Sequence, residues 1–547
     1  MDLKHTVFSH QRRRKPGPAF EVDFVNYSEG QAQVGPTPAF TRASSGTFVN
    51  ENGRIVGKTK TTTTLVPNNL TANVSVITID VPGGSVVGWL NGSTVVVMQD
   101  LNGDDIAGDA QNITGTILHK SDTTLTLRVT SRTTGAVAIS DWWVSYRGLR
   151  LEHDPITLRR RGFLKEDNRT NFVTRSGEMH LWTGNGTRVV STETCPDGTN
   201  SATLLTSGTA SYAGFLRSLN NIPHTSGRIY TVSAFVKKGN WSYVSLDWGP
   251  LRPSGGMLPF FNLDTFVFNA NGSSATGRIE HFPNGWMRLI VTGPAGSTNA
   301  TGTVADFTLT GSNGASEGGV GADKTVYVWG YQVETDNSAV GSNVSSYIPT
   351  TILPALRSGD VYTQSSISSY YNAQGGTLVG QCSLNRRTDQ VATELFRFGF
   401  EDGLSRVQLG VTNGGGQAIR AYIGIGPSGS FTFIGAGQCG GLGTLPPGPT
   451  LRKVAFTFAS NDARVCLNGT LGTQDTSVEL PSTTDLFRYN PQATIGRLWD
   501  GIITNIQYYR QRLSDSKLQT LTTTSTQDLT LGVDSITYLN DQIRITI

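Results

Sequence analysis

Apolar and polar residues alternate in short runs along most of this chain. Runs rich in Val, Ile, Thr, Tyr and Phe are separated by turn pairs such as Asn52-Gly53 and Asn91-Gly92. Alternation with a period of two places side chains on the two faces of a β-strand, and Asn-Gly favours a tight hairpin turn. One of the few segments that predict a helix is Ser514 to Leu521, with Ser514 or Asp515 as N-cap. The pattern therefore predicts an all-β protein of antiparallel sandwiches or barrels.

The length of the chain predicts several domains. At 547 residues it is too long for one ordinary domain. The clusters of strands predict an N-terminal arm with a hairpin (1–56), an inserted small β-barrel or sandwich (57–145), a larger β domain (146–355), a further sandwich (356–521) and C-terminal strands (522–547). The C-terminal strands have edges that need partners, so we expect a neighbouring chain to complete them.

Charge and cysteine content narrow the class of protein. Only 16% of the residues are charged and the net charge is +3, so nothing compels a nucleic-acid partner. No apolar segment is long enough to insert in a membrane, and no apolar stretch follows the N-terminal basic cluster as in a secretory signal. The histidines form no spaced pair, so neither a metal site nor a cofactor is predicted. Four isolated thiols fit assembly in a reducing cytoplasm; they are Cys195, Cys382, Cys439 and Cys466.

One local exception to the low charge is a basic run near the N-terminus, formed by Arg12, Arg13, Arg14 and Lys15 and closed by Pro16. Such a run can be a nuclear or nucleic-acid-binding tract, but it is more often a solvated terminal arm. We interpret it as an arm that meets an acidic surface.

The stretch "VYVWGYQVE", Val326 to Glu334, combines large aromatic side chains with an amide and a carboxylate. Strict alternation along a strand assigns its side chains to two faces. These are Tyr327, Trp329 and Tyr331 on one face, and Gly330, Gln332 and Glu334 on the other. Either the aromatic rings form a sugar platform, or the strand is part of a sandwich core that ends at a polar rim. We favour the core.

A second stretch, "NWSYVSLDWG", is the strongest candidate for a binding surface. Alternation places Ser242, Val244, Leu246 and Trp248 toward the core, and Trp241, Tyr243, Ser245 and Asp247 on the opposite face. Aromatic faces bury the apolar C–H surface of a sugar, while hydroxyls and a carboxylate bind its hydroxyl groups. The second set is therefore a candidate carbohydrate-binding platform. The alternative is that Trp241 and Tyr243 cover a neighbouring loop or a subunit interface.

Signals for catalysis and for metal binding are weak. The stretch 314–318, "GASEG", satisfies the G-x-S-x-G pattern, but a nucleophile elbow needs a strand-to-helix turn and a following His, and neither is present. The loop from Asp100 to Asp105 imitates the start of a calcium loop, yet Asp105 stands where that loop needs Gly, and Gln111 stands where it needs Glu. A polar turn is the better interpretation of this loop. We expect no enzymatic activity.

Several stretches resemble a module of bacteriophage virion proteins. "FTRASSGTFVNENGRIV" (40–56) and "RGFLKEDNRTNFVTRSGEM" (161–179) are similar to its opening and to its "RTN" segment. Further landmarks follow in order and resemble the concanavalin-like jelly roll of phage head and tail fibres: "VSAFVKKGN", "FFNLDT", "NGWMRL", "VYVWGYQVE" and "SSYIPT". The region 452–515 more loosely resembles a laminin-G-like sandwich. This chain departs from the pattern in one respect, because an extra β domain separates the opening from the "RTN" segment.

The resemblance implies a structural protein of the virion. We expect a head or tail fibre or adhesin whose lectin-like domains bind a host-surface polysaccharide, assembled as a homotrimer and attached to other virion proteins of the capsid, neck or tail through its N-terminal arm. The alternative is a decoration or connector protein that binds only other virion proteins. The sequence leaves the sugar, the host and the position on the virion open.

Overall fold

The structure is a computed structural model of the 547-residue chain. It describes residues 17–26, 32–34, 38–98, 112–133, 142–209, 214–248, 258–295, 300–315, 320–335, 344–365, 367, 370–384, 393–399, 406–411, 419–425, 430–434, 448–480, 492–495, 499–523, 536–539 and 542–545. Three predicted features lie outside these residues, wholly or in part: the basic run Arg12–Lys15, the loop Asp100–Asp105 and the second half of the "GASEG" stretch.

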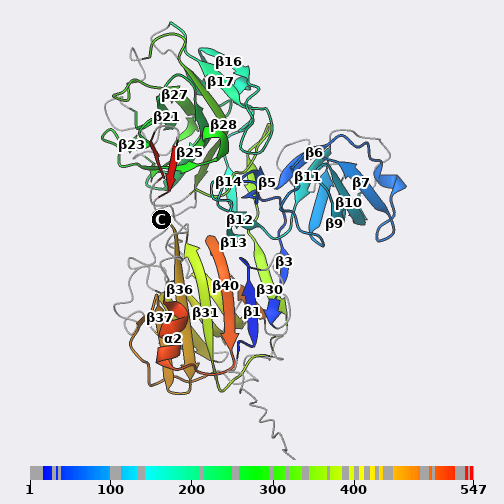
Figure 1. Ribbon diagram of the computed structural model, residues 1–547, viewed down its shortest axis with the longest axis vertical. Helices are drawn as coiled ribbons and strands as arrows, with labels where there is room; N and C mark the ends of the chain where they lie inside the picture. Colours follow the sequence, from blue (N-terminus) through cyan, green and yellow to red (C-terminus); the bar gives the residue numbers. More distant parts are fainter. Residues whose placement is uncertain are drawn as a thin grey trace, which may run out of the picture.

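The described residues confirm the all-β, multidomain prediction. The strands form three units that meet near the middle of the molecule (Figure 1), and all named strand pairings are antiparallel. Within the described residues, no helix is long and apolar enough to span a membrane. No group of three or more His, Cys, Asp or Glu side chains that could hold a metal ion occurs among them either.

The first unit is a sandwich built mainly from the C-terminal half. One sheet runs in the order β12 (Leu151–His153), β13 (Arg160–Lys165), β40 (Gly501–Tyr509), β31 (Gly375–Leu384), β36 (Gly448–Ala459), β37 (Asp462–Leu467) and β38 (Thr470–Leu471), with β1 (Phe20–Asp23) on β40 and β2 (Ala32–Val34) on β1. The other sheet is β3 (Ala39–Thr41), β30 (Val361–Ser365), β39 (Gln492–Ile495), β32 (Thr393–Gly399), β33 (Arg406–Val411), β34 (Ile419–Ile425) and β35 (Ser430–Ile434). The helix α2 (Asp515–Thr522) begins after Ser514, whose hydroxyl accepts a hydrogen bond from the Lys517 N–H.

This sandwich takes strands from across the expected boundaries. Phe20 lies opposite Tyr508, and Thr41 lies opposite Val361, so the N-terminal segment supplies a strand to each sheet. β13 joins the same sheet, with Phe163 opposite Ile503. Phe20 and Phe163 enter the sandwich core together with Tyr508. Strands β1, β2 and β3 of the N-terminal segment are therefore part of a folded domain.

The second unit is a single curled sheet of six strands that lie between residues 58 and 146. Its order is β6 (Lys58–Thr61), β11 (Trp142–Tyr146), β8 (Thr94–Met98), β9 (Asn112–Lys120), β10 (Thr124–Arg132) and β7 (Val76–Asp80), with a short 3-10 turn, η1, at Pro67–Asn69. Its concave face buries Trp89, Trp142 and Tyr146. Leu164 and Ile502 of the C-terminal sandwich pack into this same core, so the inserted unit is docked against the sandwich.

The third unit is a sandwich of two six-stranded sheets. The first, called sheet G here, is β15 (Thr183–Asn185), β18 (Phe215–Arg217), β27 (Ala305–Leu309), β21 (Tyr243–Trp248), β22 (Phe260–Asn262) and β23 (Val267–Asn269). The second, sheet H, is β16 (Thr187–Val190), β17 (Thr203–Thr206), β28 (Thr325–Thr335), β20 (Ile229–Lys238), β25 (Trp286–Pro294) and β24 (Thr276–His281). Short 3-10 turns are η2 (Met179–Leu181) and η4 (Pro283–Gly285).

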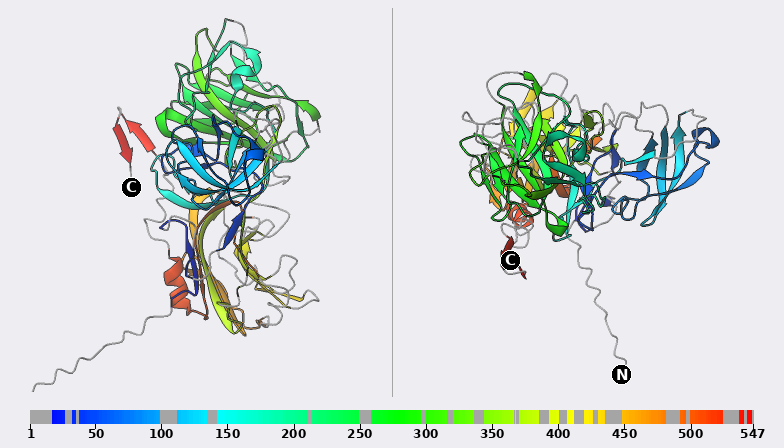
Figure 2. Two further views of the ribbon diagram at one scale, coloured as in Figure 1. Left: turned by 90° about the vertical axis from the view of Figure 1, so that its right-hand side faces the viewer. Right: turned by 90° about the horizontal axis from the view of Figure 1, so that it is seen from above.

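Four short pairs complete the fold. They are β4 (Phe48–Val49) with β5 (Ile55–Val56), β14 (Arg169–Asn171) with β29 (Ala355–Arg357), β19 (Ile222–His224) with β26 (Ala300–Thr303), and β41 (Ile536–Leu539) with β42 (Gln542–Ile545). The hairpin β4–β5 packs Val49 and Ile55 on the outer face of sheet H, against Trp286 and Trp329. The C-terminal hairpin β41–β42, drawn in red, stands apart from the three units (Figure 2).

The stretch Val326–Glu334 forms most of the central strand β28, as the core interpretation expects, but strict alternation fails within it. The pairing with β20 shifts register between Ser233 and Phe235, opposite Gly330, whose φ is +65°. Trp329 consequently packs on the outer face with Phe235, whereas Tyr331 points into the inter-sheet core beside Trp182. The expectation that Tyr331 shares a face with Trp329 is wrong, because a bulge inserts one residue between them.

Candidate functional site

Two groups of side chains are candidates for function, and the first is a set of buried charges where the three units meet. Arg42 comes from "FTRAS", Glu166 from "RGFLKEDNRTN", and Asp360 from the linker before the C-terminal sandwich. With Arg150 and Arg357 they form what we call the clasp. All five side chains are at most 1% exposed.

Each charge of the clasp has an opposite charge beside it. Asp360 accepts from Arg42 at 2.8 Å through one oxygen and from Arg150 through the other. Glu166 is 2.5 Å from Arg150 and 3.1 Å from Arg357. Burial alone would raise the pKa of Glu166 and of Asp360, but the neighbouring guanidinium groups hold both pKa values below their usual range. Every ion of the clasp is therefore paired, and the cluster ties distant segments together, since an unpaired ion here would be costly.

The amide and carboxylate that end the strand β28 belong to the same junction. Glu334 accepts hydrogen bonds from the Ser345 N–H at 2.7 Å and from its hydroxyl at 2.6 Å. Gln332 accepts from the Ile348 N–H at 2.8 Å. Both side chains are fully buried. Their function in the fold is to hold the "SSYIPT" segment, whose Ser346 in turn donates to Glu166 at 2.7 Å.

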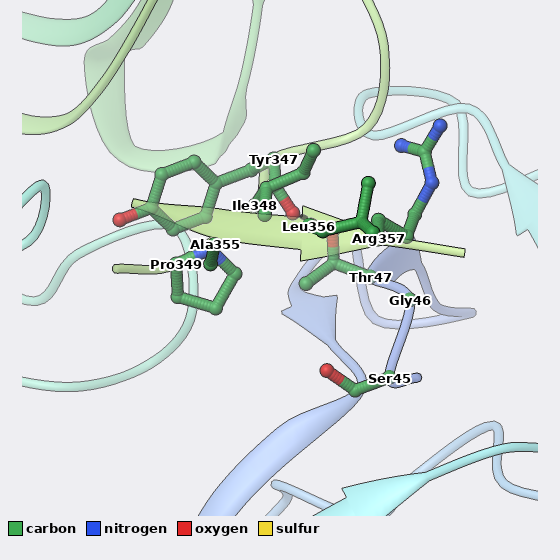
Figure 3. Close-up of a pocket in the computed structure, with 9 residues that line it drawn as sticks. All are labelled: Ser45, Gly46, Thr47, Tyr347, Ile348, Pro349, Ala355, Leu356 and Arg357. Carbon is green, nitrogen blue, oxygen red and sulfur yellow. Dashed lines mark hydrogen bonds between the residues drawn. The ribbon is translucent and has the colours of Figure 1, made fainter. Parts of the chain in front are cut away.

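A small cavity adjoins the clasp but offers no room for a substrate. Its volume is about 10 Å³, which is about the space that one water molecule needs. Figure 3 shows the side chains around it, which come from the N-terminal segment and from the residues on both sides of Pro349. The lining residues are Ser45, Gly46, Thr47, Tyr347, Ile348, Pro349, Ala355, Leu356 and Arg357.

The second candidate is the platform predicted at Trp241, Tyr243, Ser245 and Asp247. The last three belong to β21 of sheet G and alternate with its core residues, whereas Trp241 precedes the strand and packs against the inter-sheet core. Val244 and Leu246 are fully buried in the inter-sheet core, so the predicted orientation of this strand is right for these residues. Trp241 and Tyr243 are half-buried and lie edge to face, with ring centroids 5.8 Å apart. The indole N–H of Trp241 donates to the Thr310 carbonyl at 3.0 Å, which fixes the ring.

The other two members of the platform are covered. Ser245 is fully buried and its hydroxyl donates to the Pro259 carbonyl at 2.6 Å. Asp247 is 3% exposed and lies opposite Asp306 on β27. Asp306 pairs with both ends of the Arg217 guanidinium, at 2.9 and 2.7 Å. The structure therefore brings Tyr243, Ser245 and Asp247 onto one face of β21, and of the four predicted residues only Trp241 and Tyr243 are partly exposed.

Sequence reasoning missed Lys324, whose ammonium lies 5.4 Å from the centre of the Trp241 ring. It enters from the turn before β28, far along the chain, so no local pattern points to it. The clasp was also missed as a unit. Part of its signal was present, because Arg42 and Glu166 lie in two of the quoted stretches, but Arg150, Arg357 and Asp360 do not.

Comparison with known proteins gives only distant likenesses. No protein-family model matches the chain, and no curated protein matches it. Among solved structures, the CBM40 of the Ruminococcus gnavus IT-sialidase bound to alpha2,3 sialyllactose is 18% identical, over 28% of this chain and 84% of that chain, with a TM-score of 0.23.

Two further solved structures are at a similar distance. Domain 4 of AbnA, a GH43 extracellular arabinanase from Geobacillus stearothermophilus, in complex with arabinotriose, is 15% identical over 30% of this chain and 73% of that chain, with a TM-score of 0.24. The heptameric SAP-like pentraxin from Limulus polyphemus is 10% identical over 27% and 69%, with a TM-score of 0.20. Likenesses this weak carry no argument about the ligand of this chain.

Proposed function

We propose that this chain is a bacteriophage structural protein, a fibre or adhesin of the head or tail, that displays lectin-like β domains for a host-surface glycan. The resemblance of its motifs to phage virion proteins supports the virion assignment. The observation that carries the glycan proposal is the half-buried pair Trp241 and Tyr243, held rigid by the Thr310 hydrogen bond. A fixed aromatic surface loses little conformational entropy when a sugar stacks on it.

The clasp supports a display function in a second way. It binds the N-terminal segment to the linker through charges that are almost fully buried. Ser346 donates to Glu166 of the clasp, and its neighbour Ser345 donates to Glu334 of β28. A platform on such a frame keeps its orientation relative to the rest of the particle. We propose that the protein has no catalytic activity. Incubation with host polysaccharide, followed by sizing of the polymer, tests this proposal, and the polymer should keep its length.

Attachment and assembly complete the proposal. We propose that residues 1–16, with the basic run Arg12–Lys15, contact other virion proteins, and that the chain assembles as a homotrimer. Deletion of residues 1–16 leaves β1 intact and removes the basic run, so the truncated protein should fold but fail to enter particles. Normal incorporation of the truncated protein would contradict the attachment proposal. Light scattering of the purified protein measures how many copies of the chain the assembly contains, and a number other than three would contradict the homotrimer.

The decisive experiment compares adsorption of the full-length parent and of two variants to host cells. Trp241→Ala and Tyr243→Ala each remove one ring of the platform and are expected to weaken binding by about tenfold or more, because aromatic anchors dominate carbohydrate and protein contacts. Phe266→Ala is the matched control, since its ring is exposed on the same sandwich at a different place. If folded Trp241→Ala and Tyr243→Ala bind cells as the parent does, the alternative of a non-adhesive decoration or connector protein is favoured.

A further inference from the structure

The aromatic pair Trp241 and Tyr243 has a lysine beside it that the proposed function does not yet use. The ammonium of Lys324 lies 5.4 Å from the centre of the Trp241 ring, and the lysine side chain is half-buried. Among the described residues, no carboxylate forms an ion pair with this ammonium. Its contact with the ring leaves it available to a ligand that brings a negative charge of its own.

The position of Lys324 is fixed through its backbone. Its N–H donates to the Ser207 hydroxyl, and its carbonyl accepts from the Ser207 N–H, both at 2.8 Å. The Asn240 side chain binds the residues on either side of the lysine. Its amide donates to the Asp323 carbonyl at 2.9 Å, and its oxygen accepts from the Thr325 N–H at 2.7 Å. Because Asn240 directly precedes the indole of the platform, the lysine and the ring are carried by two segments that are bonded to each other, and little order is left to impose when a ligand binds.

The polar groups next to Tyr243 are able to donate hydrogen bonds. Tyr243 of β21 and Asn262 of β22 are direct cross-strand partners, so their side chains lie on the same face, and both are half-buried. The Asn262 oxygen accepts from the N–H groups of Asp264 and Thr265, at 2.9 and 3.2 Å. Its amide nitrogen and the Tyr243 hydroxyl are donors, which suits a carboxylate, since an ionised carboxylate only accepts.

Charged residues of both signs occur in the neighbouring strands and connections. They are Lys238, Asp264, Asp323, Glu317, which lies outside the described residues, and, further along sheet G, Arg217, Asp247 and Asp306. Lys238 pairs with Asp264, and Arg217 pairs with Asp306. The surroundings of the platform therefore supply no net positive field. A preference for a negatively charged sugar has to come from direct contact with the Lys324 ammonium.

We propose that the sugar bound by Trp241 and Tyr243 carries a carboxylate and that Lys324 binds this group, which rests on the glycan-binding function proposed for the same site. The two rings take the apolar C–H surface of the sugar. The ammonium makes a charge-assisted hydrogen bond to the carboxylate, and the Asn262 amide donates to it as well. A neutral sugar gains only the contact with the rings, so Lys324 determines the specificity of the platform.

The test uses the surface polysaccharide of the host, cut into oligosaccharides, in two forms. One form is native, and in the other the carboxyl groups have been chemically reduced to alcohols. Calorimetry measures the binding of each form to the full-length protein. The parent is expected to bind the native form about tenfold more tightly, because reduction removes the partner of the Lys324 ammonium. Lys324→Gln is expected to bind both forms equally, and as weakly as the parent binds the reduced form, whereas Lys324→Arg keeps the charge and should keep the preference.

The control variant is Lys120→Gln, which changes the net charge by the same amount on β9 of the inserted unit and should leave the binding of both forms unchanged. Equal binding of the two forms by the parent, or an unchanged preference in Lys324→Gln, overturns the proposal. In either case loss of adsorption in Trp241→Ala still supports the adhesin. If the parent binds neither form, and Trp241→Ala and Tyr243→Ala adsorb to cells as the parent does, the glycan-binding function fails and this proposal fails with it.

Discussion

The clasp and the Trp241 platform use polar residues in opposite ways. In the clasp, five charged side chains are almost completely removed from water and each meets an opposite charge. At the platform, the charged residue Asp247 is also buried, but the aromatic rings of Trp241 and Tyr243 stay half-exposed. The charged residues of both regions are therefore buried, and the side chains that remain partly exposed to a ligand are aromatic.

The clasp joins segments that lie far apart in the chain. Arg42, Glu166 and Asp360 come from segments more than a hundred residues apart, yet they meet within hydrogen-bonding distance. Their geometry leaves no room for a substrate, since the adjoining cavity holds about one water. The clasp residues thus join segments of the chain and do not line a binding site.

The largest expected effect comes from breaking the clasp. Arg150→Met leaves Asp360 and Glu166 with one cation each in a buried site, and should lower the free energy of unfolding by about 3–5 kcal/mol. Urea denaturation measures this change. Arg278→Met is the matched control, because its ion pair with Glu280 is about 40% exposed on both sides and should contribute less than about 1 kcal/mol. Equal losses of stability in the two variants would show that the buried ion pairs of the clasp contribute no more than an exposed ion pair does.

Local patterns predict part of this architecture and miss the rest for physical reasons. Alternation correctly places Val244 and Leu246 in the core, and the capping residue Ser514 correctly predicts where α2 begins. The pairing of Phe20 with Tyr508 depends on residues almost the whole chain apart, and no local pattern contains it. Likewise, the burial of Ser245 depends on what covers the outer face of sheet G, which alternation within one strand does not show.

A second prediction tests the bulge that separates the inner and outer faces of β28. Gly330 has a φ of +65°, and a Cβ there would lie 2.8 Å from the Phe235 ring. Gly330→Ala should therefore lower the free energy of unfolding by about 2 kcal/mol or more, since strain and overlap add. Gly92→Ala is the control, because Gly92 also has a positive φ, of +80°, but nothing lies within 4 Å of its Cβ position.

Comparison of the two glycine variants separates backbone strain from side-chain overlap at the bulge of β28. Gly92→Ala should cost only the left-handed backbone strain, about 1 kcal/mol. If both variants lose the same stability in thermal unfolding, the packing of Phe235 on the bulge contributes nothing. If Gly330→Ala alone also weakens the clasp, seen as faster amide exchange at Ser345 and Ile348, the bulge positions Gln332 and Glu334.

The last expected effect concerns Glu152, a carboxylate at the margin of the clasp. Its side chain accepts from the Val49 N–H at 2.9 Å, next to the hairpin that covers sheet H. Burial raises the pKa of Glu152 to about 7, against the attraction of Arg161 and with repulsion from Glu166. Glu166, by contrast, is held ionised by two guanidinium groups.

The sign of the pH effect follows from the direction of the shift. Because the folded pKa of Glu152 lies above its unfolded value of about 4.3, the folded state holds an extra proton between these values, and stability falls as pH rises toward 7. Glu152→Gln keeps an acceptor for Val49 and cannot ionise, so it should be more stable than the parent by roughly 1–3 kcal/mol above a pH of about 8 and equal to it below a pH of about 4. His153, whose pKa is lowered by burial and by Arg160, contributes with the opposite sign in both proteins and cancels in the difference. Urea denaturation of both proteins across this pH range measures the difference, and a constant difference at every pH would mean that Glu152 ionises in the folded protein as it does in water.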